Sequence, residues 1–470
     1  MNIFEQFVIP PSSHTLPLMD IFLILSLLLF LPFIGMLIGG TTMSMILSGI
    51  SGNTGDDNYN RFSRDILNKL SVNKNVGLGL GLIPAFSITF VYAQYLYQAP
   101  AIAISIMFIG CVIYIFAFLL TYRFHRTFET GLILDSYKLY IEPGKNLPAD
   151  VIEYKKKNAA ITKQSGRLGL FLLYVASFLF VGGASIATNP MRWAEVTNVI
   201  VLLIEFEVWI NYLYFLSFSA AITCSAILFF FFKWQGGIKD MTIDYKMLVL
   251  KVAGFTGFFS VVLLLFFVFI KFLITTEMAL STSVFVYTTL AMISILIVCS
   301  LLYAVLKNHE VRFASAIFFF MILIFLFTSL KDQALLGNAL SDHLAPIIAE
   351  QDKLIESKTQ PIAQDESAID GSQIYQTKCS ACHKGDVKLV GPPYMETIPK
   401  YNGDIKKLAG FIYNPVKVNP EYPAMPSQGL SVAESEAVAK YLMDTYGGGA
   451  GGEEKESDKQ GTDNKEPESK

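Results

Sequence analysis

The stretch "YQTKCSACHKGD", residues 375–386, holds two of the five cysteines and one of the five histidines of this 470-residue chain. Its spacing, Cys379-x-x-Cys382-His383, is that of segments to which haem is attached covalently. A disulfide between the two cysteines is the alternative interpretation of the pair. The motif predicts one covalent haem c near the C-terminus.

Three features flank this motif in order. Gly371 and Tyr375 precede it at four-residue spacing, "GPP" follows at 391–393, and "EYPAMPSQGLS" stands at 421–431. With these features, residues 369–446 resemble class I cytochrome c, a family of small all-α proteins. The resemblance implies a fold of short helices around one haem, with electron transfer as its activity.

The resemblance also implies a role for each matched residue. The implied site residues are Cys379 and Cys382 as haem thioethers, His383 and Met425 as axial iron ligands, and Gly391 and Pro392 in the haem pocket loop. A backbone carbonyl of that loop would hold the imidazole and tune its basicity. A histidine–methionine pair raises the potential and fills both axial positions, which favours electron transfer over catalysis at the iron.

Met395 and Met443 are the alternatives to Met425 as the sixth ligand. Met395 follows the proline turn too closely, and Met443 lies within a predicted helix at about 431–445. That helix opens with Ser431-x-x-Glu434, a capping box. Its apolar stripe should face the first helix of the domain.

The rest of the chain is more apolar than a water-soluble globule. Hydrophobic residues make up 53% of the sequence and charged residues 16%, with a mean hydropathy of +0.47. Apolar stretches of about 20 residues can cross about 30 Å of hydrocarbon as helices. Eight spans are predicted, at about 19–46, 76–97, 101–122, 168–187, 208–232, 248–270, 283–306 and 312–330. The predicted fold is therefore an all-α, polytopic helical membrane bundle followed by the small all-α cytochrome c domain.

Basic residues lie mainly in alternate connections between these spans. The connections that would share one side are 47–75, 123–167, 233–251 and 307–312. They carry 19 lysines and arginines, whereas the opposite connections offer Arg192 and Lys271. Because basic loops face the cytoplasm, the N-terminus and all residues after 331 are predicted on the periplasmic side of a bacterial inner membrane. Haem is attached to c-type cytochromes on that side, so the two predictions agree.

The chain is predicted to have four parts. They are a transmembrane domain at 1–343, a linker at 344–368, the cytochrome c domain at 369–446 and a disordered tail at 447–470. The linker is expected to begin as a short helix and continue as a polar tether. The tail is glycine-rich and then charged, so it cannot bury enough apolar surface to fold.

Histidines and acids are scarce in the membrane part. No histidine falls in the middle of a span, although haems within helical bundles need inward-facing histidines. His14, alone or with His343, could ligate a membrane haem b near the outer face; the alternative is an ordinary interfacial side chain. The acids Asp20, Glu205 and Glu207 lie near outer boundaries, where a proton path or quinone contact is a second interpretation.

The N-terminal third contains "SSHTLPLMD" at 12–20 and "NYNRFSRDILNKLSVN" at 58–73, before a span with repeated glycines followed by phenylalanines. In these features residues 1–125 resemble the first helical bundle of cytochrome bd oxidase subunit I. The resemblance implies that His14 is a haem ligand. The span at 101–122 lacks the acidic residue of that family, so oxygen reduction by this chain alone is not expected.

Three functions are consistent with the sequence. The preferred hypothesis is an electron-transfer subunit of a respiratory complex, which passes single electrons through haem c to or from a bd-like, haem-bearing membrane partner. The second is a bd-like quinol- or cytochrome c-oxidising oxygen reductase subunit with its own haem at His14, and the third is a haem-free scaffold that anchors a cytochrome c. The expected partners are membrane lipid, haem-bearing membrane subunits and a soluble or membrane electron donor or acceptor; no nucleic acid is expected.

Overall fold

The computed structural model describes residues 8–70, 74–137, 148–239, 241–275, 279–359 and 369–448. Within these ranges the chain is helical and has no β-strand, which confirms the predicted all-α fold. The chain forms two compact units, Met1–Leu354 and Ile355–Lys470. The predicted tether at 360–368 and the predicted disordered tail from 449 onward lie outside the described residues.

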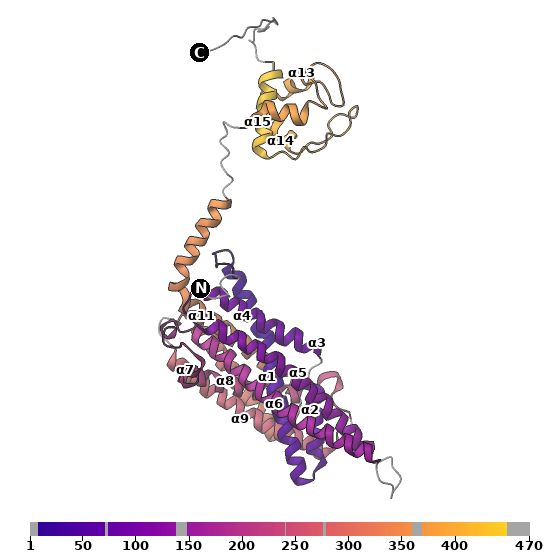
Figure 1. Ribbon diagram of the computed structural model, residues 1–470, viewed down its shortest axis with the longest axis vertical. Coiled ribbons are helices and arrows are strands. Elements are labelled where there is room, and N and C mark those ends of the chain that lie inside the picture. Colours follow the sequence, from indigo (N-terminus) through magenta and orange to yellow (C-terminus); the bar gives the residue numbers. More distant parts are fainter. Residues whose placement is uncertain are drawn as a thin grey trace, which may run out of the picture. The chain divides into compact units, whose positions relative to one another are not determined.

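Eight helices of the first unit are long and apolar enough to cross a membrane. They are α1 (Leu16–Thr54), the π turn η2 (Gly77–Leu82) with α4 (Ile83–Tyr95), α5 (Ala103–Tyr137), α6 (Ala149–Ala187), α8 (Phe206–Phe232), α9 (Ile243–Ile274), α10 (Thr282–Asn308) and α11 (Ala314–Thr359). Short elements connect them: α2 (Asp57–Leu70), α3 (Lys74–Val76), η4 (Pro190–Arg192), α7 (Val199–Ile204) and η5 (Trp234–Gly236). Each of these eight corresponds to one predicted span to within about two residues at the ends where the span is the longer, and together they indicate a multi-pass membrane protein (Figure 1).

Helix α1 packs against α2, α4, α6 and α8 at the centre of this unit. Its glycines allow the close approach to α8, because a Cβ on Gly39 would overlap the hydroxyl of Thr223. The Ser219 hydroxyl donates a hydrogen bond to the Gly35 carbonyl, with 2.6 Å between the oxygens. Small residues and interhelical hydrogen bonds of this kind hold helices together where lipid removes the hydrophobic driving force.

Several helices are longer than the apolar spans that predicted them. Helix α6 begins at Ala149 instead of 168, because the polar segment before the span is also helical. Helix α11 continues through Pro346 to Thr359, so the short helix predicted from 344 is the end of α11 and not a separate element. Leu336, Leu340 and Leu344 are buried at four-residue spacing and attach this extension to the first unit.

The second unit consists of short helices around a small core. Its elements are α12 (Gly371–Ile374), the π turn η7 (Tyr375–Cys379), α13 (Tyr394–Thr397), the 3-10 helix η8 (Ile398–Tyr401), α14 (Ile405–Tyr413) and α15 (Val432–Tyr446). Helix α15 packs against both α12 and α14. Both hydrogen bonds of the predicted capping box are present, since the Ser431 hydroxyl caps the Glu434 N–H and the Glu434 carboxylate accepts from the Ser431 N–H.

Candidate functional site

The cysteine motif is positioned by the contact between the first and last helices of the second unit. A Cβ on Gly371 would overlap the carbonyl of Ala437, so only glycine lets α12 lie directly against α15. One turn later the rings of Tyr375 and Tyr441 pack with centroids 5.4 Å apart. This confirms the prediction that the apolar stripe of α15 faces the first helix.

A widened helical turn then presents the motif. The Ser380 N–H donates to the Tyr375 carbonyl at 2.9 Å, which closes the π turn η7. The His383 N–H donates to the Cys379 carbonyl at 3.0 Å, so the chain from Cys379 to His383 forms a tight turn. Cys379, Cys382 and His383 consequently line one cavity. Single π turns in helices are frequent at functional sites.

The loop after the motif fixes the imidazole of His383. Its Nδ1 lies 3.0 Å from the Pro392 carbonyl, and the Gly391 N–H donates to the Cys382 carbonyl at 2.8 Å. Since the carbonyl can only accept, Nδ1 carries the proton and Nε2 keeps its lone pair for a metal. A Cβ on Gly391 would overlap the imidazole ring, so this position forms a cradle that only glycine leaves open.

Met425 lines the same cavity, and the alternative methionines do not. Its loop also contributes Pro423, Ala424 and Pro426 to the lining. Met395 is 60% exposed, and Met443 packs against the core of the second unit. The cavity therefore offers two thiols, an imidazole with a free Nε2 and one thioether, a set of donors that fits a covalent haem.

An aromatic stack beside the imidazole was missed by the sequence analysis. The ring of Tyr394 stacks on His383 with centroids 4.9 Å apart, and Tyr446 stacks on the other face of Tyr394 at 5.5 Å. Burial raises the pKa of Tyr394, so its hydroxyl stays neutral. Tyr446 follows Val438 and Leu442 at four-residue spacing, and extending the apolar stripe by one turn would have found it.

The two cysteines differ in accessibility. Cys379 is 6% exposed and belongs to the core, whereas Cys382 is half-buried. Burial, together with the neighbouring Cys382, raises the pKa of the Cys379 thiol. Because the thiolate is the reactive form, the folded unit keeps this cysteine in its unreactive, protonated state.

His14 and His343, the two histidines considered as ligands of a membrane haem, have different surroundings. His14 is exposed just before α1, while Nε2 of His343 lies 2.9 Å from the Tyr97 carbonyl and its ring packs edge-on against Trp193. Within the described ranges, no hydrogen bond or ring contact joins His14 to His343. A membrane haem at His14 stays a prediction.

The three acids that the sequence places near span ends, Asp20, Glu205 and Glu207, each have a polar partner. Asp20 accepts a hydrogen bond from the hydroxyl of Tyr95. Glu205 pairs with Arg192 at 3.2 Å, between Oε1 and Nη1. Glu207 accepts a hydrogen bond from the Asn189 amide, also at 3.2 Å.

Comparison with known proteins identifies the second unit only. The family model described as cytochrome c matches residues 368–445. Among curated proteins, cytochrome c-551 of Azotobacter vinelandii is 35% identical over 77 residues, which cover 16% of this chain and 94% of that protein. No solved structure matches the chain.

Proposed function

Through residues 368–445 this chain belongs to the cytochrome c family, and from that premise we propose that it is a membrane-anchored electron-transfer subunit of a respiratory complex. The family implies a covalently bound haem c and transfer of electrons through it. The apolar helices indicate that the haem domain is attached to a membrane protein. We propose that the chain holds one haem c and passes single electrons to or from a bd-like, haem-bearing membrane partner.

The observation that carries this proposal is the support of the His383 imidazole in the cavity that Met425 also lines. The Pro392 carbonyl fixes Nδ1 at 3.0 Å and directs Nε2 into the cavity that Met425 lines. A haem iron with both axial positions filled has no site for a substrate, but it can cycle between two oxidation states. The residues that line the cavity would hold the haem, and the haem would supply the one-electron chemistry.

The charge distribution supports the proposed side of the membrane. The 19 lysines and arginines in alternate connections favour a cytoplasmic location for those loops. The haem domain then faces the periplasm of a bacterial inner membrane, where it can meet a soluble or membrane-bound donor or acceptor. Membrane lipid would surround the helices of the first unit.

Haem typing of the purified full-length chain tests the proposal. Pyridine haemochrome spectra, with iron counted per polypeptide, should give one haem c and one iron. A chain without covalent haem would overturn the proposal. A second, non-covalent haem that is lost on His14→Ala would instead support the oxidase-like alternative and transfer the search for a catalytic centre to the first unit.

A further inference from the structure

The membrane unit contains a cavity of about 170 Å³ between α1, α4, α6, α8, α9 and α11. An engineered apolar protein cavity of about 150 Å³ holds one benzene molecule. The cavity is therefore large enough for one six-membered ring. Its deep wall is apolar and includes Leu31, Ile88, Phe180, Phe215 and Phe218.

Its lining changes character along α8. Glu207 and Asn211 lie within the first two turns of that helix, and Phe215 and Phe218 follow deeper in the bundle. At about 1.5 Å per residue, the polar and apolar ends are roughly 16 Å apart along the helix axis. Lys271 in the last turn of α9 lies at the polar end, so the cavity is amphipathic.

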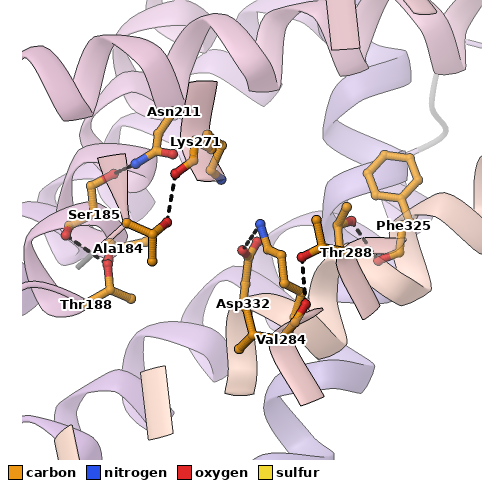
Figure 2. Close-up of polar contacts among 12 residues, drawn as sticks. Ala184, Ser185, Thr188, Asn211, Lys271, Val284, Thr288, Phe325 and Asp332 are labelled. Atoms are coloured by element: carbon orange, nitrogen blue, oxygen red, sulfur yellow. Dashed lines mark hydrogen bonds and ion pairs between the residues drawn. The ribbon is translucent and has the colours of Figure 1, made fainter. Parts of the chain in front are cut away.

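Each charged group at the polar end has a partner, which is an opposite charge, an amide or an aromatic ring. Asp332 pairs with Lys331 at 2.9 Å between Oδ1 and Nζ, and Glu207 accepts from Asn189 (Figure 2 shows the Asp332 pair). The Nζ of Lys271 lies 4.7 Å from the centroid of the Tyr214 ring. These contacts offset the cost of placing charges in a membrane bundle, and they favour a neutral ligand because no single charge dominates.

Two buried polar atoms at this end have no hydrogen-bond partner among the described residues. Asn211 uses its amide nitrogen to donate to the Ser185 hydroxyl at 2.8 Å, as Figure 2 shows, and its Oδ1 is left over. The Tyr214 hydroxyl is the second, on a side chain that is 7% exposed. The Thr328 hydroxyl is a polar neighbour of Tyr214; it donates its own proton to the Ile324 and Phe325 carbonyls and makes no hydrogen bond of good geometry with the Tyr214 hydroxyl. Because unpaired buried polar atoms are costly, both point to a ligand.

We propose that this cavity binds the ring of a lipid-soluble quinol or quinone. A ring hydroxyl donates to Asn211 Oδ1, a ring oxygen accepts from the Tyr214 hydroxyl, and the ring face packs on the phenylalanines. Size, amphipathic lining and the two unpaired atoms argue for an oxygenated ring independently of the haem. The choice of a redox-active ring among such compounds rests on the proposed electron-transfer function.

A binding experiment on the full-length protein tests this site. The protein is placed in quinone-free phospholipid nanodiscs and titrated calorimetrically with tetramethyl-1,4-benzoquinone and with the corresponding quinol. The variants are Tyr214→Phe and Asn211→Leu, which remove the unpaired atoms, and Ala184→Phe, which fills the cavity. Tyr212→Phe is the matched control, because its hydroxyl donates to the Tyr174 carbonyl and the residue is not part of the lining.

We expect saturable binding of one molecule per chain. Affinity for the quinol should fall at least tenfold in Tyr214→Phe and in Asn211→Leu, and affinity for the quinone, which has no hydroxyl to donate to Asn211, at least tenfold in Tyr214→Phe. Both affinities should be lost in Ala184→Phe, while Tyr212→Phe stays within twofold of the wild type. Absence of saturable binding, or equal affinity in all variants, would overturn the site. Reduction of the haem by ascorbate is measured in the same samples, so that failure of the quinone site is distinguished from failure of the haem assignment.

Discussion

The haem site and the membrane cavity differ in how their lining residues are distributed along the sequence. The haem site comes from two short stretches of the chain, residues 378–392 and the loop 423–428 that contains Met425. The membrane cavity draws its lining from six helices between Leu27 and Leu335. A site whose residues are close together in the sequence can be recognised as a motif. A site whose residues come from separate helices leaves no such pattern, because only the packing of the helices brings its residues together.

The largest effect should come from removing the thioether cysteines. The double variant Cys379→Ser, Cys382→Ser should abolish covalent haem, since no other pair in the chain has this spacing. Haem staining of denatured protein on a gel measures this directly. Cys299→Ser, at a half-buried position in α10, should stain like the wild type; loss of staining there would show that the haem site depends on the membrane unit.

Replacing the proposed sixth ligand should alter the haem without losing it. Met425→Ala should lower the midpoint potential by on the order of 100 mV, because axial ligands set haem potentials over a range of about 0.8 V. Met395→Ala, at an exposed position, should leave the potential unchanged in the same redox titration. If Met395→Ala gave the larger shift, the ligand assignment would be wrong.

A substitution at the contact between α1 and α8 should weaken the membrane unit without affecting the haem-binding unit. Gly39→Ala places a Cβ against the Thr223 hydroxyl, and overpacking of this kind costs about 1–3 kcal/mol. All three tryptophans lie at positions 193–234, so tryptophan fluorescence follows unfolding of this unit, and haem absorbance follows the other. The fluorescence transition should occur at a lower temperature with no change in the haem transition.

Gly49→Ala is the control on the same helix, because its Cβ would meet no other atom within 4 Å. Equal shifts of both transitions in Gly39→Ala would contradict the separation of the two units. A shift in Gly49→Ala as large as that in Gly39→Ala would remove the packing explanation.

The cradle under the imidazole should be sensitive to a single methyl group. Gly391→Ala would push the His383 ring from its place, and we expect a loss of about 1–3 kcal/mol in urea unfolding followed by haem absorbance. Gly410→Ala in α14 adds the same methyl group in open space and should not destabilise the protein. An equal loss of unfolding free energy in Gly391→Ala and Gly410→Ala would contradict the role of Gly391 in leaving space for the imidazole.

The smallest effect concerns the capping box and depends on pH. The Ser431 N–H, donating at 2.7 Å, holds the pKa of the Glu434 carboxyl below its usual value. A carboxyl with a lowered native pKa stabilises the fold above its unfolded pKa, and this stabilisation is lost as the pH falls through the native pKa. The difference in urea midpoint between wild type and Glu434→Gln should therefore be present at pH 7 and shrink toward acidic pH. Glu436→Gln serves as the control, and a difference that grows toward acidic pH would contradict the cap.

Periodic and local features of the molecule could be predicted from the sequence. The eight apolar spans each correspond to a helix, because length and hydropathy decide which segments can cross a membrane. The capping box and the stripe of α15 were likewise predictable from spacing. The resemblance to class I cytochrome c, and not periodicity, implied one shared site for His383, Met425, Gly391 and Pro392. The structure brings these residues into contact or into one cavity; their ligation of haem stays a prediction.

The membrane cavity could not be predicted from the sequence, because some of its lining residues lie beyond the ends of the predicted apolar spans. The apolar pattern ends the last span at 330 and so leaves out Asp332, although α11 continues through it. The pattern also places Lys271 in a connection between spans, whereas α9 extends to Ile274 and puts Lys271 in the cavity lining. Polar residues at helix ends have no period, so only packing shows which of them converge.

The position of Cys379 has a consequence for how the protein is made. Its thiol is enclosed by a core that includes Val438, Ala439 and Leu442 of α15, the last helix of the unit to leave the ribosome. Because burial disfavours the reactive thiolate, we expect haem to attach faster before α15 docks than after it. At about 5–20 residues per second, synthesis from residue 383 to residue 446 takes roughly 3–13 s. We therefore expect haem attachment to compete with folding of the second unit. A variant in which α15 docks faster should accumulate protein without haem.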